Sequence, residues 1–143
     1  MTAVPGIRAS YEKEKLTFPI TFPLLPMVRF YVREWAAVSG LPRDRREAFV
    51  LAAYETACNA VLHGGGHGLL RLYEHHGALH CQVFDQGPGF FADADADAEA
   101  PESCGTTTDS KRGLWMVRQL TDHLKITTDT TGTVVSFAIT LPP

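Results

Sequence analysis

Glu55 and Asn59 form the first pair of side chains that could do chemistry together. They stand four positions apart in a segment with helical apolar spacing, which brings them onto one helix face, and His63 extends the stripe by one turn. An amide oxygen can ligate Mg²⁺, and a carboxylate can accept the proton of an attacking hydroxyl group or orient that group. The alternative is an exposed polar stripe on a surface helix, which would have the same spacing.

A second candidate site lies in the segment Asp85-Gln86-Gly87-Pro88-Gly89-Phe90, where an acidic residue follows an apolar stretch. A carboxylate only accepts hydrogen bonds, so Asp85 suits an exocyclic amine such as N6 of adenine. Gly87 and Gly89 would let the backbone approach a flat base closely. The alternative is an ordinary turn, because Asp, Gly and Pro are common in turns for reasons unrelated to ligands.

Two further segments could contribute to the same kind of site. Lys111-Arg112-Gly113-Leu114 begins a helix that we expect to run from 113 to about 122. The free N–H groups and the positive dipole end of a helix N-terminus favour phosphate, although ordinary helix initiation explains the same residues. Gly132-Thr133 begins the last predicted strand, and taken alone it indicates only a turn.

The elements that must position these residues follow from hydrophobic periodicity. Alternating apolar residues predict strands, and apolar residues three to four positions apart predict helices. The predicted order is strand, helix, helix, strand, strand, loop, helix, strand and strand, over 15–21, 24–39, 42–63, 69–74, 78–84, 86–112, 113–122, 123–127 and 133–141. This order predicts an α+β fold, a two-layer α/β sandwich in which helices pack on one mostly antiparallel or mixed sheet.

The predicted loop over 86–112 has no sustained periodicity. Between 91 and 103 it alternates Ala with acidic residues, and this composition cannot bury enough apolar area to order itself. Long loops inside compact domains are usually functional lids or disordered segments, and both descriptions could hold here. We therefore expect a mobile lid over about 86–112 and a flexible N-terminus over 1–14.

Composition limits the partners and the compartment. A chain of 143 residues with 45% hydrophobic residues can bury one core, whereas a second domain would need more length. The net charge is −3 and the 13 basic residues are scattered, so direct binding of nucleic acid is not expected. No apolar run approaches the roughly 20 residues of a spanning helix, so we expect a cytoplasmic protein without membrane association.

Several other residues have simpler interpretations. Three cysteines without a C-x-x-C pair indicate reduced thiols rather than a disulfide framework or a zinc site. Trp35 and Trp115 stand at helical apolar positions, so both are expected in the core. The spacing of His75, His76 and His80 does not support a closed metal site, and we interpret them as surface histidines.

Each motif is weak alone, but their order is specific. An acidic residue four positions before Asn on a helix, D-x-G-x-G after a strand, a lid, and Gly-Leu opening a helix together resemble the histidine kinase-like ATPase superfamily. The resemblance covers residues 16 to 141 and implies a Bergerat-type ATP-binding fold over 15–143. Within that superfamily, E-x-x-x-N-A-x-x-H-G and G-L-W-M-V-R-Q-L-T-D look like the anti-sigma factor serine/threonine kinase branch.

The resemblance implies a role for individual residues. Asn59 matches the residue that holds Mg²⁺, and Glu55 matches the general base or the group that orients the attacking hydroxyl. Asp85 matches the adenine-reading residue, with Gly87 and Gly89 lining the base. The position of His63 also matches the motif, without a role that its chemistry assigns.

The resemblance also implies how the rest of ATP is held. Thr133 matches a threonine that contacts adenine directly or through water, and Gly113 with the following N–H groups matches the triphosphate-binding end of the lid. Lys111, Arg112 and Leu114 adjoin that end. The family often carries Gly-x-Gly-Leu here, and Lys111 replaces the first glycine. A lysine could pair with phosphate oxygens or restrict the backbone.

The function that the resemblance implies is phosphorylation of serine on an antagonist protein with Mg-ATP. The implied partners are a sigma factor and an anti-sigma-factor antagonist, and the implied oligomer is a homodimer. One alternative is a nucleotide-gated protein-binding module that transfers nothing. A detached sensor-kinase catalytic domain is disfavoured, because most sensor kinases carry Asn where this chain has Glu55 and because no dimerising helix with a phosphoacceptor His precedes the domain.

Overall fold

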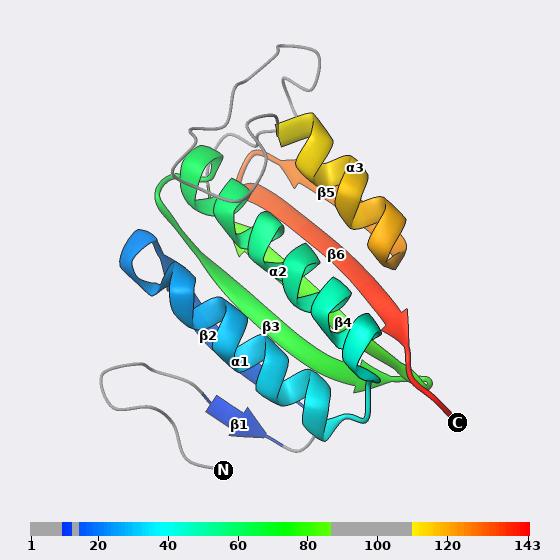
Figure 1. Cartoon of the computed structure of the whole chain (residues 1–143). Coiled ribbons are helices and arrows are strands. Elements are labelled where there is room, and N and C mark those ends of the chain that lie inside the picture. The colour runs from blue at the N-terminus through cyan, green and yellow to red at the C-terminus, as the bar shows by residue number, and fades with distance from the viewer. Residues whose placement is uncertain (1–9, 13–14, 87–109) are drawn as a thin grey trace.

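The structure, a computed structural model, describes residues 10–12, 15–86 and 110–143. These residues form one sheet of six strands in the order β1-β2-β3-β4-β6-β5, with antiparallel neighbours, and three α-helices lie on one face of the sheet (Figure 1). The elements are β1 (Ser10–Glu12), β2 (Lys15–Thr21), the 3-10 helix η1 (Phe22–Leu24), α1 (Leu25–Val38), α2 (Arg43–His63), β3 (His67–His75), β4 (Ala78–Asp85), α3 (Ser110–Leu120), β5 (Asp122–Asp129) and β6 (Gly132–Thr140). The predicted α+β two-layer sandwich is therefore confirmed.

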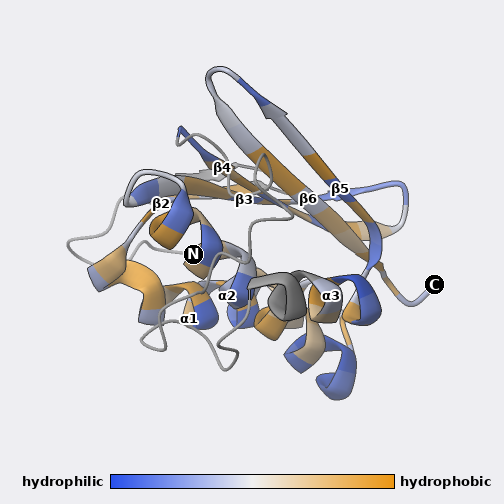
Figure 2. Ribbon diagram, turned by 90° about the horizontal axis from the view of Figure 1, so that it is seen from above, coloured by the Kyte–Doolittle hydropathy of each residue, from blue (hydrophilic) through white to orange (hydrophobic). Residues whose placement is uncertain are grey.

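The core lies between the sheet and the helices, which Figure 2 shows as two layers. Alternate residues of β2, β4 and β6 turn toward the helices, as period-two patterning requires. The fully buried members of this face include Leu16, Phe18, Ile20, Leu79, Cys81, Val83, Phe137 and Ile139. On the helix side, α1 contributes the predicted apolar face, which includes Val28, Val32, Trp35 and Ala36. The periodicities in the sequence thus identify the core faces correctly.

Helix α2 is the central element of the helix layer, with α1 on one side and α3 on the other (Figure 1). Its predicted apolar residues, from Phe49 to Val61, are all buried, and several polar residues are buried with them. A helix covered by the sheet below and by a helix on each side has little surface left for solvent. Any polar side chain near its middle is therefore held inside the protein.

The N-terminal edge of the sheet differs from the prediction. Ser10–Glu12 form strand β1, with Ser10 opposite Thr17 of β2, although the sequence indicates a flexible segment there. Three residues are too few to show a period, so the pairing depends on β2 rather than on a pattern in β1. Among the described residues, β1 pairs only with 15–17 of β2, so Pro19 has a strand partner on β3 alone. This edge position explains why a residue without an N–H group is tolerated there.

The two tryptophans differ in environment. Trp35 is 8% exposed and belongs to the core, as predicted, whereas Trp115 is 62% exposed, so its predicted core position is wrong. Helix α3 turns Val117 inward, and Thr121, directly after the helix, is also buried. A residue two positions before Val117 lies about 200° around the helix, which directs Trp115 to solvent.

The cysteines also differ from one another. Cys81 is a buried free thiol on β4, whereas Cys58 is disulfide-bonded, so the prediction of reduced thiols is wrong for Cys58. Cys104 lies outside the described residues. None of the helices that the structure describes is both long and apolar enough to cross a bilayer.

Candidate functional site

Helix α2 places Glu55 and Asn59 inside the protein. Their side chains are 4% and 9% exposed, respectively, so the alternative of an exposed polar stripe is wrong. His63, one turn further, is half-buried, and burial lowers the pKa of its imidazole. Thr56, another buried polar residue of α2, donates its hydroxyl proton to the carbonyl oxygen of Ala52 at 2.8 Å and is satisfied within the helix.

The side chain of Asn59 differs from that of Thr56 in this respect. Its Nδ2 is buried, and within the described part of the chain it has no hydrogen-bond partner. A buried amide group without a partner costs about 1–3 kcal/mol, so such groups in folded proteins call for an explanation. A polar ligand beside α2 would supply the missing partner, and Asn59 offers it an amide oxygen as well as the amide nitrogen.

Strand β4 places Asp85 at the same end of the molecule as the end of α2. Asp85 pairs with Gly68 of β3 and with Thr133 of β6, so it lies at the centre of three strands. Asp85 also follows Val83 by two positions, and Val83 faces the helices, so the side chain of Asp85 points to the helix layer.

Thr133 is brought to Asp85 by the sheet. The two residues are directly opposite in the antiparallel β4–β6 ladder, and such pairs carry their side chains on one face. Thr133 is 1% exposed, and its hydroxyl oxygen lies 3.2 Å from that of Thr128 on β5. The structure therefore brings together the two residues that the sequence analysis assigns to the adenine end of the site.

Gly64, the C-cap of α2, joins the two halves of the site. A Cβ atom at this position would collide with Cβ and Cγ of Asp85 and with the carbonyl oxygen of Ala60. The Asp85 side chain thus packs against the end of α2. At a rise of about 1.5 Å per residue, Asn59 precedes Gly64 by about 7.5 Å along the axis of α2, and Glu55 precedes it by about 13.5 Å.

The phosphate end of the predicted site is described only through the backbone of α3. The helix begins at Ser110, so Lys111, Arg112, Gly113 and Leu114 lie within its first turns, and the prediction that the helix begins at Gly113 is wrong. The N–H groups of α3 without an intrahelical partner include those of 110–112, rather than those after Gly113. Gly87, Gly89 and most of the predicted lid lie outside the described residues.

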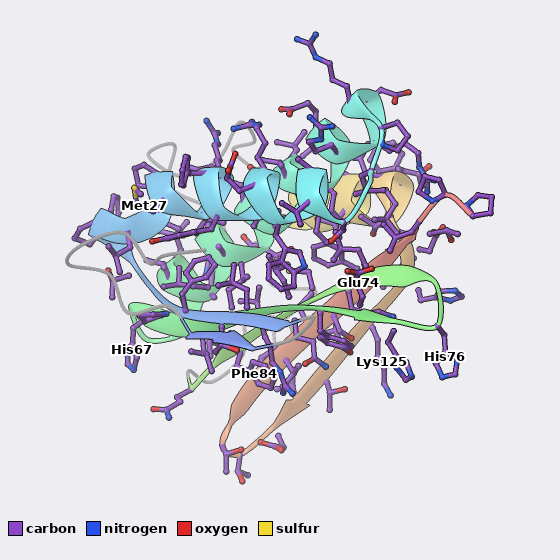
Figure 3. The ribbon with its side chains drawn as sticks, turned by 90° about the horizontal axis from the view of Figure 1, so that it is seen from below. Met27, His67, Glu74, His76, Phe84 and Lys125 are labelled. Carbon is purple, nitrogen blue, oxygen red and sulfur yellow. The ribbon has the colours of Figure 1, made fainter. Side chains whose placement is uncertain are left out.

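A separate hollow lies on the far side of the sheet. It has a volume of about 270 Å³ and is lined by His67, Gly68, Leu69, Phe84, Asp85 and Gln86. Phe84 projects from the sheet face opposite the helices (Figure 3), and Leu69 pairs with it on that face. The apolar walls of the hollow therefore face away from Glu55 and Asn59, and the hollow is not the site on α2.

A cluster of histidines lies at the other end of β4, and the sequence analysis found only part of it. His75, His76 and His80 meet His123 and Asp122 around a hollow of about 250 Å³. The rings of His75 and His76 are 3.9 Å apart between centroids, and those of His75 and His80 are 6.1 Å apart. Among residues 10–12, 15–86 and 110–143, no three His, Cys, Asp or Glu side chains are arranged to hold a metal ion.

The sequence did not indicate that His123 belongs to this cluster, because only the pairing of β4 with β6 and of β6 with β5 brings it near the β3–β4 hairpin. Burial lowers the pKa of His80, and the neighbouring imidazoles of His75, His123 and His76 lower it further. A hydrogen bond with the backbone of His75 opposes this shift. The His80 ring also stacks on Tyr73 at a centroid distance of 4.8 Å.

Comparison with known proteins defines the class of this chain. A family model described as the histidine kinase-like ATPase domain matches residues 18–139, and the chain belongs to that family. The match spans β2 to β6 and so includes Glu55, Asn59, Asp85 and Thr133. Among curated proteins, none matches the chain significantly.

Solved structures share the fold. One is the crystal structure of the RsbU and RsbW domains of Rv1364c from Mycobacterium tuberculosis, with 21% identity and a TM-score of 0.63 over 87% of this chain and 32% of the other. Another is the blue-light activated histidine kinase EL346 of Erythrobacter litoralis, with 22% identity and a TM-score of 0.52 over 87% of this chain and 42% of the other. The chain thus spans less than half the length of either protein.

Proposed function

We propose that this chain binds Mg-ATP and transfers phosphate to serine on a partner protein, as a cytoplasmic anti-sigma factor. The observation that carries the proposal is the burial of Glu55 and Asn59 on α2, whose C-terminal end packs on Asp85. The buried Nδ2 of Asn59 has no partner among the described residues, and such a group destabilises a protein unless it serves a ligand. From Asp85 at the C-terminal end of α2, Asn59 and then Glu55 follow along the helix, and this order agrees with the order of base and phosphates in ATP.

The base end of the proposed site consists of Asp85 and Thr133. The carboxylate of Asp85 would accept a hydrogen bond from N6 of adenine, and the buried hydroxyl of Thr133 would contact the base directly or through water. Gly87 and Gly89 are proposed to line the base. This arrangement would select adenine, because a carboxylate cannot donate to the O6 acceptor of guanine.

The phosphate end of the proposed site consists of Asn59 and the start of α3. The amide oxygen of Asn59 would coordinate a metal ion, and a phosphate oxygen would accept a hydrogen bond from the buried Nδ2, which has no partner among the described residues. A Mg²⁺ ion, when bound there, would neutralise charge on the phosphates. Lys111 and Arg112, with the free N–H groups of 110–112 and the backbone at Gly113, are proposed to hold the triphosphate.

Glu55 is the proposed catalytic residue. It lies one helical turn from Asn59, on the side away from Asp85, where the terminal phosphate would lie. Its carboxylate would accept the proton of the attacking serine hydroxyl, or orient that hydroxyl, as phosphate is transferred. The burial of Glu55 would keep water away from the reacting phosphate and so limit hydrolysis of ATP.

The proposed partners are a sigma factor and its anti-sigma-factor antagonist, and the proposed oligomer is a homodimer. The likeness to a structure that holds RsbU and RsbW domains in one chain supports a regulatory partner protein. The segments E-x-x-x-N-A-x-x-H-G and G-L-W-M-V-R-Q-L-T-D, which resemble the serine kinase branch, support a sigma factor and its antagonist as the partners.

A second candidate function is a nucleotide-gated binding module. Lys111 favours it, because lysine replaces a glycine of the family pattern where the backbone would approach the phosphates. Incubation of the protein with Mg²⁺, labelled ATP and candidate antagonist proteins encoded nearby distinguishes the two. The kinase reading predicts label on a serine of the antagonist. Binding of ATP and partner without any labelled serine would favour the binding module.

A further inference from the structure

Three glycines from three elements enclose the end of β4. Gly64 caps α2, Gly68 lies in β3, and Gly132 begins β6. A Cβ atom at Gly68 would collide with the carbonyl oxygen of Phe84, and one at Gly132 with the carbonyl oxygen of Asp85. Together with the contact between Gly64 and Asp85, these approaches leave the last residues of β4 no room to shift. We call Gly64, Gly68 and Gly132 the glycine socket.

Members of the socket approach different parts of the end of β4. Gly68 and Gly132 approach the backbone of β4 and so fix the path of the strand. Of the three, only Gly64 approaches the side chain of Asp85, at its Cβ and Cγ atoms. Because Cγ carries both carboxylate oxygens, the close approach of Gly64 limits the directions in which the carboxylate can point.

The backbone conformation of Gly64 does not explain why the residue is glycine. Its φ of −108° is accessible to any residue, so the requirement at this position is space. Gly65 and Gly66 differ, since their φ values of 90° and 89° lie in the left-handed region that favours glycine. A Cβ at Gly66 would meet nothing within 4 Å. The triple glycine therefore contains one residue required by space and two required by conformation.

From these contacts we infer that Gly64 is a positioning residue that aims the Asp85 carboxylate and thereby determines the preference for adenine over guanine. The inference rests on the proposed function, in which Asp85 accepts a hydrogen bond from adenine N6. Guanine presents an acceptor, O6, at the same position, so the preference depends on where the acceptor-only carboxylate lies. A methyl group at Gly64 would displace that carboxylate.

The test is the ratio of ATP to GTP affinity, measured by calorimetry on Gly64→Ala. We expect ATP affinity to fall about tenfold or more, as for loss of a charge-assisted hydrogen bond, and GTP affinity to change little. The matched control is Gly66→Ala, which strains the backbone of the same loop in open space. It should lower thermal stability without changing the ratio. An unchanged ratio in folded Gly64→Ala would overturn the inference.

Combination with Asp85→Asn separates this inference from the proposed function. If the inference holds, Asp85→Asn lowers the ratio and Gly64→Ala adds little to it, because both changes remove the same hydrogen bond. A multiplicative effect of the two changes would show that Gly64 acts independently of Asp85. If Asp85→Asn alone leaves the ratio unchanged, the proposed role of Asp85 fails, and the inference fails with it.

Loss of folding in Gly64→Ala is also informative, because Gly64 has a second neighbour in the carbonyl oxygen of Ala60. Asp85→Gly removes the side chain that the new methyl group would meet and leaves that carbonyl in place. Recovery of cooperative thermal unfolding in the double variant would support the contact with Asp85. Failure to fold in both backgrounds would assign the collision to Ala60 and overturn the inference.

Discussion

Asp85 and Thr133 lie directly opposite each other in the β4–β6 ladder, although α3 and β5 separate them in the chain. Their side chains share the face of the sheet that meets α2, and the Asp85 side chain packs on the C-cap of that helix. Two residues with different hydrogen-bonding capacity therefore lie side by side at one end of α2. This pairing defines the base end of the proposed nucleotide site.

Replacement of Asp85 with Asn should weaken ATP binding by about 2 kcal/mol or more while the fold remains intact. The amide keeps the size of the side chain but removes the charge and turns part of an acceptor into a donor. Calorimetric titration with ATP measures the effect. Asp122→Asn, an exposed acid-to-amide change at the start of β5, is the matched control and should bind ATP normally. Unchanged affinity in folded Asp85→Asn would remove Asp85 from the site.

Thr133→Val should weaken ATP binding about threefold to tenfold, the usual value of one neutral hydrogen bond. Valine keeps the shape of threonine but cannot contact adenine through a hydroxyl group. Thr128→Val is the control, because it breaks the same contact between Thr128 and Thr133 and leaves the buried hydroxyl of Thr133 in place. Equal loss of affinity in the two variants would mean that Thr133 acts only through its contact with β5.

Asn59→Leu should separate stability from binding. The buried Nδ2 has no partner among the described residues, so an apolar side chain of similar size should leave the free energy of unfolding unchanged or raise it by up to about 1 kcal/mol. The variant should also lose the enhancement of ATP affinity by Mg²⁺. Thermal unfolding without nucleotide and calorimetry with and without Mg²⁺ measure the two effects. Marked destabilisation would indicate that Asn59 has a structural role instead.

Acid should destabilise the protein partly through His80. Burial, the largest cause, and the neighbouring imidazoles lower the pKa of His80 in the folded state. As the pH falls below the ordinary histidine value of about 6.5, the unfolded chain takes up the proton first, and stability decreases. His80→Phe keeps the stacking on Tyr73 but cannot titrate, so its melting temperature should fall less between neutral and mildly acidic pH. His67→Phe, at an exposed position, is the control, and equal acid sensitivity of His80→Phe and the wild type would refute this account.

Periodicity predicted the sheet, the helices and the candidate residues Glu55 and Asn59, because spacing alone determines which side chains share a face. It could not predict their burial, which depends on α1 and α3 flanking α2. The same limit explains Trp115, whose apolar character indicates a core position that the orientation of α3 does not provide. His123 joins the other histidines only through strand pairing. The role of Gly64 depends on a contact with Asp85 that has no signature in the sequence.

Phosphate transfer by Glu55→Gln tests the central claim most directly. Glutamine keeps the size and polarity of the buried side chain but cannot accept the serine proton, so the account predicts normal binding of ATP and partner with transfer reduced by roughly 10²-fold or more. Glu34→Gln, an exposed change on α1, should transfer at the wild-type rate. The measurement is the initial rate of label transfer from ATP to the partner serine. A wild-type rate in Glu55→Gln would contradict the proposed role of Glu55. If the wild-type protein transfers no label to any candidate antagonist, the proposed kinase activity is contradicted.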